Sequence, residues 1–277
     1  MPDTKLVTDH YTHGSLIKAI ESGLAKAGKS VESATIDDLA PVDEFHIGGR
    51  AASAHFFEQL EITAQHRVLD VGCGLGGGAR FAASHYGCDV VGVDLTPEYV
   101  ATGNTLCNWV GLDDKVSLRV SDASQLVFED ESFDRIYLMH VGMNVADKNA
   151  LMIGLGRLLR TDGLLGIYDI MRTGEGAQTF PVPWASVPEG SEVASLEGYK
   201  EAVDAAGLAL VRTQNRGDFA VNFFEKLRAH ASSSSGPPPL GLHIVMGDQQ
   251  AKKIQNLASD IARNMLAPIE LIARKTG

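Results

Sequence analysis

A run of glycines and a set of carboxylates stand where a nucleoside cofactor could be held. The stretch from Val68 to Arg80, VLDVGCGLGGGAR, places its glycines directly after a short apolar segment. Read from Gly72, it satisfies the G-x-G-x-x-G pattern of dinucleotide-binding loops, but with Asp70 included it reads D-x-G-x-G-x-G. Such a loop brings backbone N–H groups close to a ligand. Asp94 ends the next apolar segment, where a carboxylate can accept hydrogen bonds from both ribose hydroxyls. The sequence therefore predicts a site for a ribose-bearing cofactor.

The charge of these residues decides between cofactors. A dinucleotide presents a pyrophosphate, and the carboxylate of Asp70 would repel it. A cofactor with an ammonium and a sulfonium group would be attracted instead. Asp122, in the segment SDAS, closes a third apolar segment and could accept a hydrogen bond from an adenine amino group. Carboxylates at three successive strand ends favour S-adenosylmethionine, and an NAD(P)-dependent oxidoreductase is the alternative.

The elements that must position these residues alternate between strand and helix. Apolar runs of strand length are separated by segments with helical spacing, which is typical of a mostly parallel sheet with helices on both faces. We expect a doubly wound α/β fold. The segment 37–49 is expected to be a loop that contains a proline and glycines, and 149–163 a helix that ends at Gly163. The expected strands are 67–71, 88–95, 115–123, 133–141, 164–171, 208–217 and 268–276.

Two regions fall outside the alternating pattern. Residues 1–65 contain helical spacing and no convincing strand, and they are interpreted as an N-terminal helical lid. Residues 66–277 would form the cofactor-binding domain, with a helical insertion at about 217–265.

Composition excludes some partners and locations. The formal net charge of −11 argues against nucleic acid, which recruits lysine and arginine. No apolar run is long enough to span a membrane, and the first residues do not resemble a signal peptide. An odd number of cysteines without zinc spacing fits a reducing cytoplasm. His10 and His13 form H-x-x-H without a third ligand, so no metal is expected. The sequence is also compatible with a homodimer.

The segment from Arg67 to Met171 resembles class I S-adenosylmethionine-dependent methyltransferases. LDVGCGLGG, GVDL, SDAS, FEDESFDRIYLMHV and LGRLLRTDGLLGIYDI match that family's motifs in order. The resemblance implies the sheet order 3-2-1-4-5-7-6 with strand 7 antiparallel. It also implies a set of cofactor-binding residues, which are Asp70, Gly72, Gly74, Gly76, Asp94, Leu95, Asp122, Ala123 and His140.

The methyl acceptor is less well defined. LAPVDEFHIGGR, HVGMN and FPVPWA resemble bacterial sarcosine/dimethylglycine and ubiquinone-type methyltransferases. This resemblance and the acidic composition favour an amine nitrogen of a small molecule, with oxygen, carbon and sulfur as alternatives. A non-catalytic protein that binds S-adenosylmethionine and uses its cap for interaction is a further alternative.

Two residues at strand ends are candidates for catalysis. His140 follows the fourth strand and could act as a general base or orient the acceptor, or it could only hydrogen-bond the neighbouring loop. Asp169 ends the fifth strand, where a carboxylate would stabilise a methylated amine, unless it caps a helix or pairs with Arg172.

The acceptor should lie between the strand ends and the cap. Trp184 could offer a cationic acceptor its aromatic face, or it could simply pack within the cap. Phe45 and His46 could close over the site, and Tyr11 could act as a lid residue. Alternatively, Phe45 and His46 belong to an ordinary turn between helices, and Tyr11 is an aromatic side chain at the surface. Met143 and Asn144, which follow His140, could line the same wall.

Overall fold

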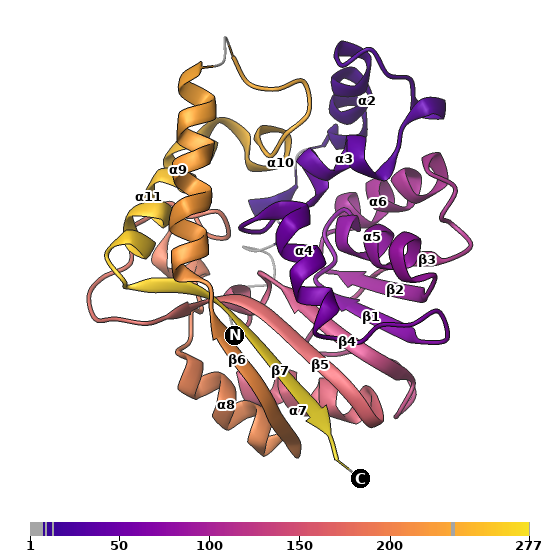
Figure 1. The fold of residues 1–277 in the computed structure, drawn as a ribbon, viewed down its shortest axis with the longest axis vertical. Coiled ribbons are helices and arrows are strands. Elements are labelled where there is room, and N and C mark those ends of the chain that lie inside the picture. The colour runs from indigo at the N-terminus through magenta and orange to yellow at the C-terminus, as the bar shows by residue number, and fades with distance from the viewer. Residues whose placement is uncertain (1–7, 9, 13, 234–235, 277) are drawn as a thin grey trace.

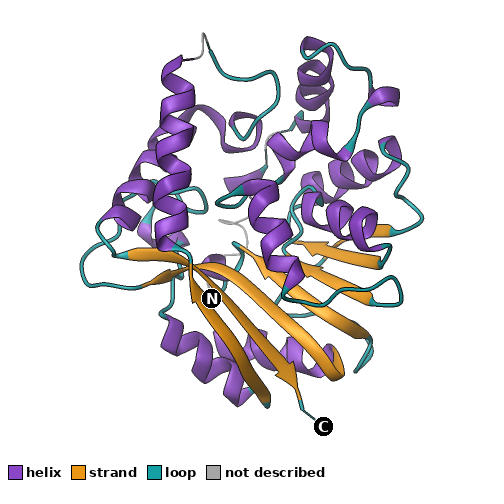
Figure 2. Ribbon diagram, viewed as in Figure 1, coloured by secondary structure: helices purple, strands orange, loops and turns teal. Residues whose placement is uncertain are grey.

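A central sheet organises the molecule (Figures 1 and 2). The computed structural model describes residues 8, 10–12, 14–233 and 236–276. Within these residues the sheet has seven strands in the order β3-β2-β1-β4-β5-β7-β6, and β7 runs antiparallel to both of its neighbours. The predicted order is therefore confirmed. The strands are β1 (Arg67–Val71), β2 (Asp89–Asp94), β3 (Val116–Val120), β4 (Phe133–Met139), β5 (Leu159–Arg172), β6 (Leu208–Asn215) and β7 (Leu266–Lys275).

Helices cover both faces of the sheet, because the central parallel strands are apolar on both faces. One core cluster joins the sheet to α7 (Lys148–Leu158) and α8 (Leu196–Ala205). A second cluster joins the opposite face to α4 (Gly49–Glu58), α5 (Gly77–Tyr86) and α6 (Pro97–Trp109). Although the sequence groups α4 with the N-terminal lid, its buried phenylalanines pack in the core of the sheet.

The remaining helices lie on the side of the sheet where the parallel strands end (Figure 1). From the N-terminal region come α2 (Leu16–Lys26) and α3 (Ile36–Asp43), and from the late region come α9 (Gly217–Ser233), α10 (His243–Met246) and α11 (Gln250–Ala262). The short helix α10 packs with α2 and α3, and α9 packs with α11. Segments from the two ends of the chain thus meet above the strand ends.

The expectation of a loop over 37–49 is wrong for its first half, where α3 forms. Thr35 caps the helix: its side chain accepts a hydrogen bond from the Asp38 amide, and its own amide donates to the Asp38 carboxylate. The proline that suggested a loop, Pro41, lies within this helix. Buried Leu39 and Val42 hold the helix on the cap, which shows that capping and burial outweigh the proline here.

The helix expected over 149–163 ends five residues earlier, at Leu158. Leu159 already belongs to β5 and pairs with Phe133 of β4. Asp162 adopts a positive φ of 62°, and a bulge between Phe133 and Arg135 takes up the extra residues. Sheet pairing, which is not visible in the helical spacing, has overridden the local pattern.

In the described part of the chain, no helix has both the length and the apolar character needed to cross a membrane. No cluster of histidine, cysteine and acidic side chains suited to a metal was found there either. His13 of the H-x-x-H motif and residues 1–7 of the predicted lid lie outside the described residues.

Candidate functional site

The turn from β1 into α5 approaches its neighbours so closely that it needs glycine. Gly72 has a positive φ of 71°, and a Cβ atom there would lie 2.4 Å from a methyl carbon of Val141. The amide of Gly74 donates a hydrogen bond of 2.9 Å to the Asp94 carboxylate. The carboxylate at the end of β2 therefore holds the glycine turn in place.

Gly76 has a different place from the one predicted. It is the N-cap of α5, and a Cβ atom there would meet Leu118 at 2.8 Å, so it packs against β3 and does not line the cavity. Its role is to let the helix start close to the sheet. Gly78, in the first turn of α5, lines the cavity instead.

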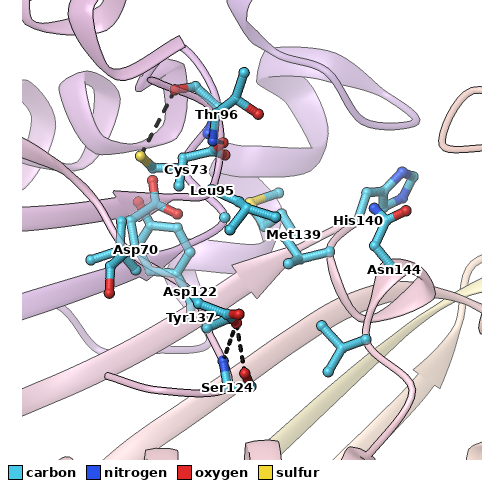
Figure 3. A pocket seen from close by; sticks show the side chains of 18 of the residues that line it. Asp70, Cys73, Leu95, Thr96, Asp122, Ser124, Tyr137, Met139, His140 and Asn144 are labelled. Atoms are coloured by element: carbon cyan, nitrogen blue, oxygen red, sulfur yellow. Dashed lines mark hydrogen bonds between the residues drawn. The ribbon is translucent and has the colours of Figure 1, made fainter. Parts of the chain in front are cut away.

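A cavity of about 1030 Å³ opens where β1, β2 and β4 end (Figure 3). Apart from Gly76, every residue predicted to bind the cofactor lines this cavity. They are Asp70, Gly72, Gly74, Asp94, Leu95, Asp122, Ala123 and His140.

Acidic side chains give the cavity its electrostatic character. Burial raises the pKa of Asp70 to about 7, and the hydroxyl of Tyr137 beside it opposes that rise. Burial also raises the pKa of Asp94, whose carboxylate accepts hydrogen bonds from the amides of Gly74 and Thr96. Asp122 is held by the amide and hydroxyl of Ser124, at 2.8 and 2.7 Å (Figure 3). The site is therefore built to receive a cation.

His140 lies at the boundary of this cavity and carries two unusual features. Its φ is +58°, a left-handed conformation that is uncommon for a residue other than glycine. Its Nε2 atom is buried and has no hydrogen-bond partner among the described residues. Burial, with His46 nearby, lowers the pKa of His140 well below its usual value, so the ring is neutral at pH 7. A neutral imidazole with an available nitrogen can accept a proton.

A second chamber, of about 1160 Å³, lies under the cap. It shares Tyr11, Phe45, His46 and His140 with the first cavity. Its other walls are mainly apolar and come from α3, α9, α10, α11, the loops around them and the loop after β4. They include Met143, Trp184, Phe223, Phe224, Leu227, Leu240, Met246, Ile254 and Leu257.

The residues predicted to bind the acceptor lie along these two spaces. Tyr11, Phe45 and His46 line both of them, whereas Asn144 lines the first and Met143 and Trp184 the second. The side-chain amide of Asn144 donates to the Tyr11 hydroxyl at 3.4 Å, which joins the N-terminal segment to the loop after β4.

The catalytic role predicted for Asp169 does not fit its position. The side chain is completely buried and lines neither space. Its carboxylate accepts hydrogen bonds from the amides of Val141 and Gly142 and from the Tyr199 hydroxyl, at 2.8, 3.1 and 2.8 Å. Asp169 thus supports the loop that carries His140.

Comparison with known proteins agrees with this geometry. Residues 69–167 match the family model described as a methyltransferase domain. Methyltransferase GfsG from Streptomyces halstedii is 29% identical over 209 residues, which cover 74% of this chain and 73% of that protein. Phosphoethanolamine N-methyltransferase 3 from Arabidopsis thaliana is 29% identical over 174 residues, which cover 62% of this chain and 34% of the relative. The chain thus aligns with about a third of that longer protein.

The chain carries a class I S-adenosylmethionine-dependent methyltransferase domain. It is an S-adenosylmethionine-dependent methyltransferase enzyme. The fold of the solved [4+2]-cyclase SpnF is similar, with a TM-score of 0.71 at 21% identity, covering 99% of this chain and 97% of SpnF. The resemblance in fold therefore includes the cap.

The cavity of this methyltransferase suits its donor. Besides the acidic side chains, it is lined by Asp43 and Tyr99, which each have a buried side-chain oxygen without a partner among the described residues. Unpartnered buried oxygens are costly unless a ligand satisfies them. The ammonium, ribose and adenine groups of S-adenosylmethionine provide such donors.

Sequence reasoning missed several residues that line this methyltransferase's cavities. Asp43 and Glu44 were assigned to a loop, and no motif marks Tyr99. Phe223 and Phe224 could have been found, because the pair lies in a segment whose apolar side chains recur at helical spacing. What the sequence does not show is that this face turns towards a chamber.

Proposed function

We propose that this enzyme methylates a hydroxyl oxygen of a large, mostly apolar small molecule, with His140 as the general base. One observation carries the proposal: the buried Nε2 atom of the neutral His140 ring has no partner in the described part of the chain, and His140 lines both the donor cavity and the apolar chamber. A hydroxyl group must lose its proton when it is methylated, and this nitrogen would receive it.

The chamber is less suited to an amine as the methyl acceptor, although the sequence favours an amine. A methylated amine becomes cationic and would need a carboxylate near it. Asp169 lies outside the chamber, and the one carboxylate among its described lining residues is that of Glu44. Glu44 is already paired with Arg50 at 2.6 Å and accepts a hydrogen bond from Ser53. The apolar walls favour an uncharged acceptor atom.

The remaining residues would hold and enclose the reactants. Asp70 would bind the ammonium group, Asp94 the ribose hydroxyls and Asp122 the adenine. When bound, S-adenosylmethionine supplies a methyl group that its sulfonium already activates. Tyr11 and Phe45, which lie between the two spaces, would exclude water and align the acceptor.

The test compares two acceptors that differ in one atom, 4-nonylphenol and 4-nonylaniline, with labelled S-adenosylmethionine. We expect methylation of the phenol, and a loss of about 10²- to 10⁴-fold in kcat for His140→Gln, the range typical of a general base. Calorimetric titration with S-adenosylhomocysteine checks that the variant still holds the cofactor. Methylation of the aniline alone would assign the enzyme to nitrogen, and an unchanged kcat in the variant would remove His140 as the base.

A further inference from the structure

Arg228 differs from the other arginines of the chain. The other arginine side chains each contact a carboxylate, an amide or carbonyl oxygen, a hydroxyl group or an aromatic ring. The guanidinium of Arg228 makes no such contact with any residue that the structure describes, although the side chain lines the apolar chamber. Arg228 is an exposed residue at the edge of the apolar chamber, and its guanidinium, which has no partner among the described residues, is available to a ligand.

The position of Arg228 along α9 places it far from the methyl-transfer end. Helix α9 starts beside the segment that carries His46, because the ring of Phe219 lies against Gly48. The helix then runs away from the sheet (Figure 1). Arg228 is nine residues beyond Phe219, which corresponds to about 13 Å along a helix. Between them, Phe223, Phe224 and Leu227 line the chamber.

The two ends of this chamber differ in the charge of their side chains. At the inner end, Glu44 is neutralised by Arg50. At the outer end the described lining residues include Arg228 with His230 and His243, and no acidic side chain accompanies them. An occupant would therefore meet apolar walls along its length and basic side chains at its far end.

We propose that Arg228 binds an anionic group, a carboxylate or a phosphate, at the end of the acceptor opposite to the atom that is methylated. This inference rests on the proposed function, since it names the class of its acceptor: an elongated apolar molecule with one acidic end. Guanidinium matches both kinds of anion, because its fixed N–H groups bind two oxygens at once. The helical rise of about 13 Å from Phe219 to Arg228 separates this anion site from the inner end of α9.

The test measures binding without methyl transfer. Trp184 lines the chamber, and Trp109→Phe leaves it as the only tryptophan, so its fluorescence reports occupancy. The probes are dodecanoate, dodecyl phosphate and dodecanol, titrated below their aggregation concentrations. We expect one or both anions to bind about fivefold more tightly than dodecanol, as fits an ion pair near the surface. Comparison of the affinities for dodecanoate and dodecyl phosphate shows whether the site prefers a carboxylate or a phosphate.

Two variants test the assignment to Arg228. Arg228→Gln should abolish the preference for the anions and leave dodecanol binding unchanged. Lys226→Gln is the matched control, because it removes the same charge from the same helix at an exposed residue that does not line the chamber. It should leave the preference intact.

The outcomes separate this inference from the proposed function. Equal affinity for the three probes, or a preference that survives Arg228→Gln, overturns the inference and leaves hydroxyl methylation standing. A preference that depends on Arg228 supports the anion site even if neither nonyl acceptor is methylated, and the proposed hydroxyl chemistry is then what fails. If no probe binds, the inference is overturned together with the proposed apolar acceptor.

Discussion

Asp70 shows how a single side chain can make donor binding depend on pH. Its carboxylate is buried at the bottom of an acidic cavity, and its pKa is about 7. A carboxylate binds an ammonium group well only when ionised, and ionisation is complete only above the pKa. Because the pKa is raised, the charge is lost as the pH falls through 7, far above the range in which an ordinary aspartate is protonated.

We therefore expect the affinity for S-adenosylhomocysteine to fall by about tenfold from pH 8 to pH 6, because the ionised fraction of Asp70 falls by that factor. Calorimetric titration at both pH values measures it. 5′-Methylthioadenosine, which has no amino-acid part, serves as the control ligand and should show a smaller change. Asp70→Asn should reduce the affinity for S-adenosylhomocysteine and remove the difference between the ligands. Parallel pH profiles for both ligands in the unmodified enzyme would contradict this role.

The carboxylates also show which site residues could be predicted from the sequence. Asp70, Asp94 and Asp122 were predictable, because their position at or near the ends of apolar strands fixes which edge of the sheet they occupy. Asp169 was expected to end the fifth strand, but β5 continues to Arg172, and the carboxylate lines neither space and supports Val141 and Gly142. Which way a side chain at a strand end turns depends on the loop beside it, and the sequence does not show that.

At the scale of elements, a buried ion pair connects the cap to the cofactor helix. Asp43 ends α3 and Arg80 lies in α5, with 2.6 Å between Oδ2 and Nη2 and both side chains almost fully buried. The backbone of Asp43 lies so close to Gly77 that a Cβ atom there would be 2.5 Å from its carbonyl oxygen. The N-terminal cap is therefore fixed to the first turn of the helix that borders the donor cavity.

Arg80→Met should lower the free energy of unfolding by about 3–5 kcal/mol, because it leaves the Asp43 charge buried without its partner. Urea unfolding followed by circular dichroism measures this. Lys115→Met is the control: it breaks the pair between Lys115 and Asp89, whose side chains are 41% and 67% exposed, and should have a much smaller effect. Equal effects of the two substitutions would show that the buried pair does not hold the cap.

The helices were predictable to different degrees. Segments with an apolar stripe and a clear end, such as α2 and α8, can be recognised as helices from the sequence. The helix α3 was missed because Pro41 suggested a loop, and α7 was extended too far because the pairing of Leu159 with Phe133 is a contact between distant residues. Local spacing predicts that a helix exists, but tertiary pairing decides where it ends.

For the molecule as a whole, the donor and acceptor spaces come from different parts of the chain. The sheet and its loops build the acidic cavity, whereas the N-terminal segment and the late helices build most of the apolar chamber. The motifs of the first part occur in order along the sequence and so predicted the sheet and the donor. The second part combines segments that are distant in sequence and carry no motif, which is why the acceptor could not be predicted.

A polar substitution in the chamber should therefore affect one reactant only. Leu227 is 40% exposed and lines the chamber, so Leu227→Gln should fold normally and raise the KM for 4-nonylphenol about fivefold, since a lost apolar contact costs about 1 kcal/mol. Titration with S-adenosylhomocysteine should show no change. Ile153→Gln, at a residue that is 51% exposed and lines neither space, is the matched control. An equal rise in KM for both variants would contradict the assignment of the chamber.

At His140, the left-handed backbone conformation favours glycine, whereas the proposed reaction needs the histidine side chain. A residue with a Cβ atom is strained in that conformation by about 1 kcal/mol or more, and glycine would relieve the strain. Glycine would also remove the nitrogen that the proposed chemistry needs. A search for more thermostable variants should therefore also measure turnover, because relief of this strain by glycine removes the base of the proposed reaction. Residue 140 should be held constant in any such selection.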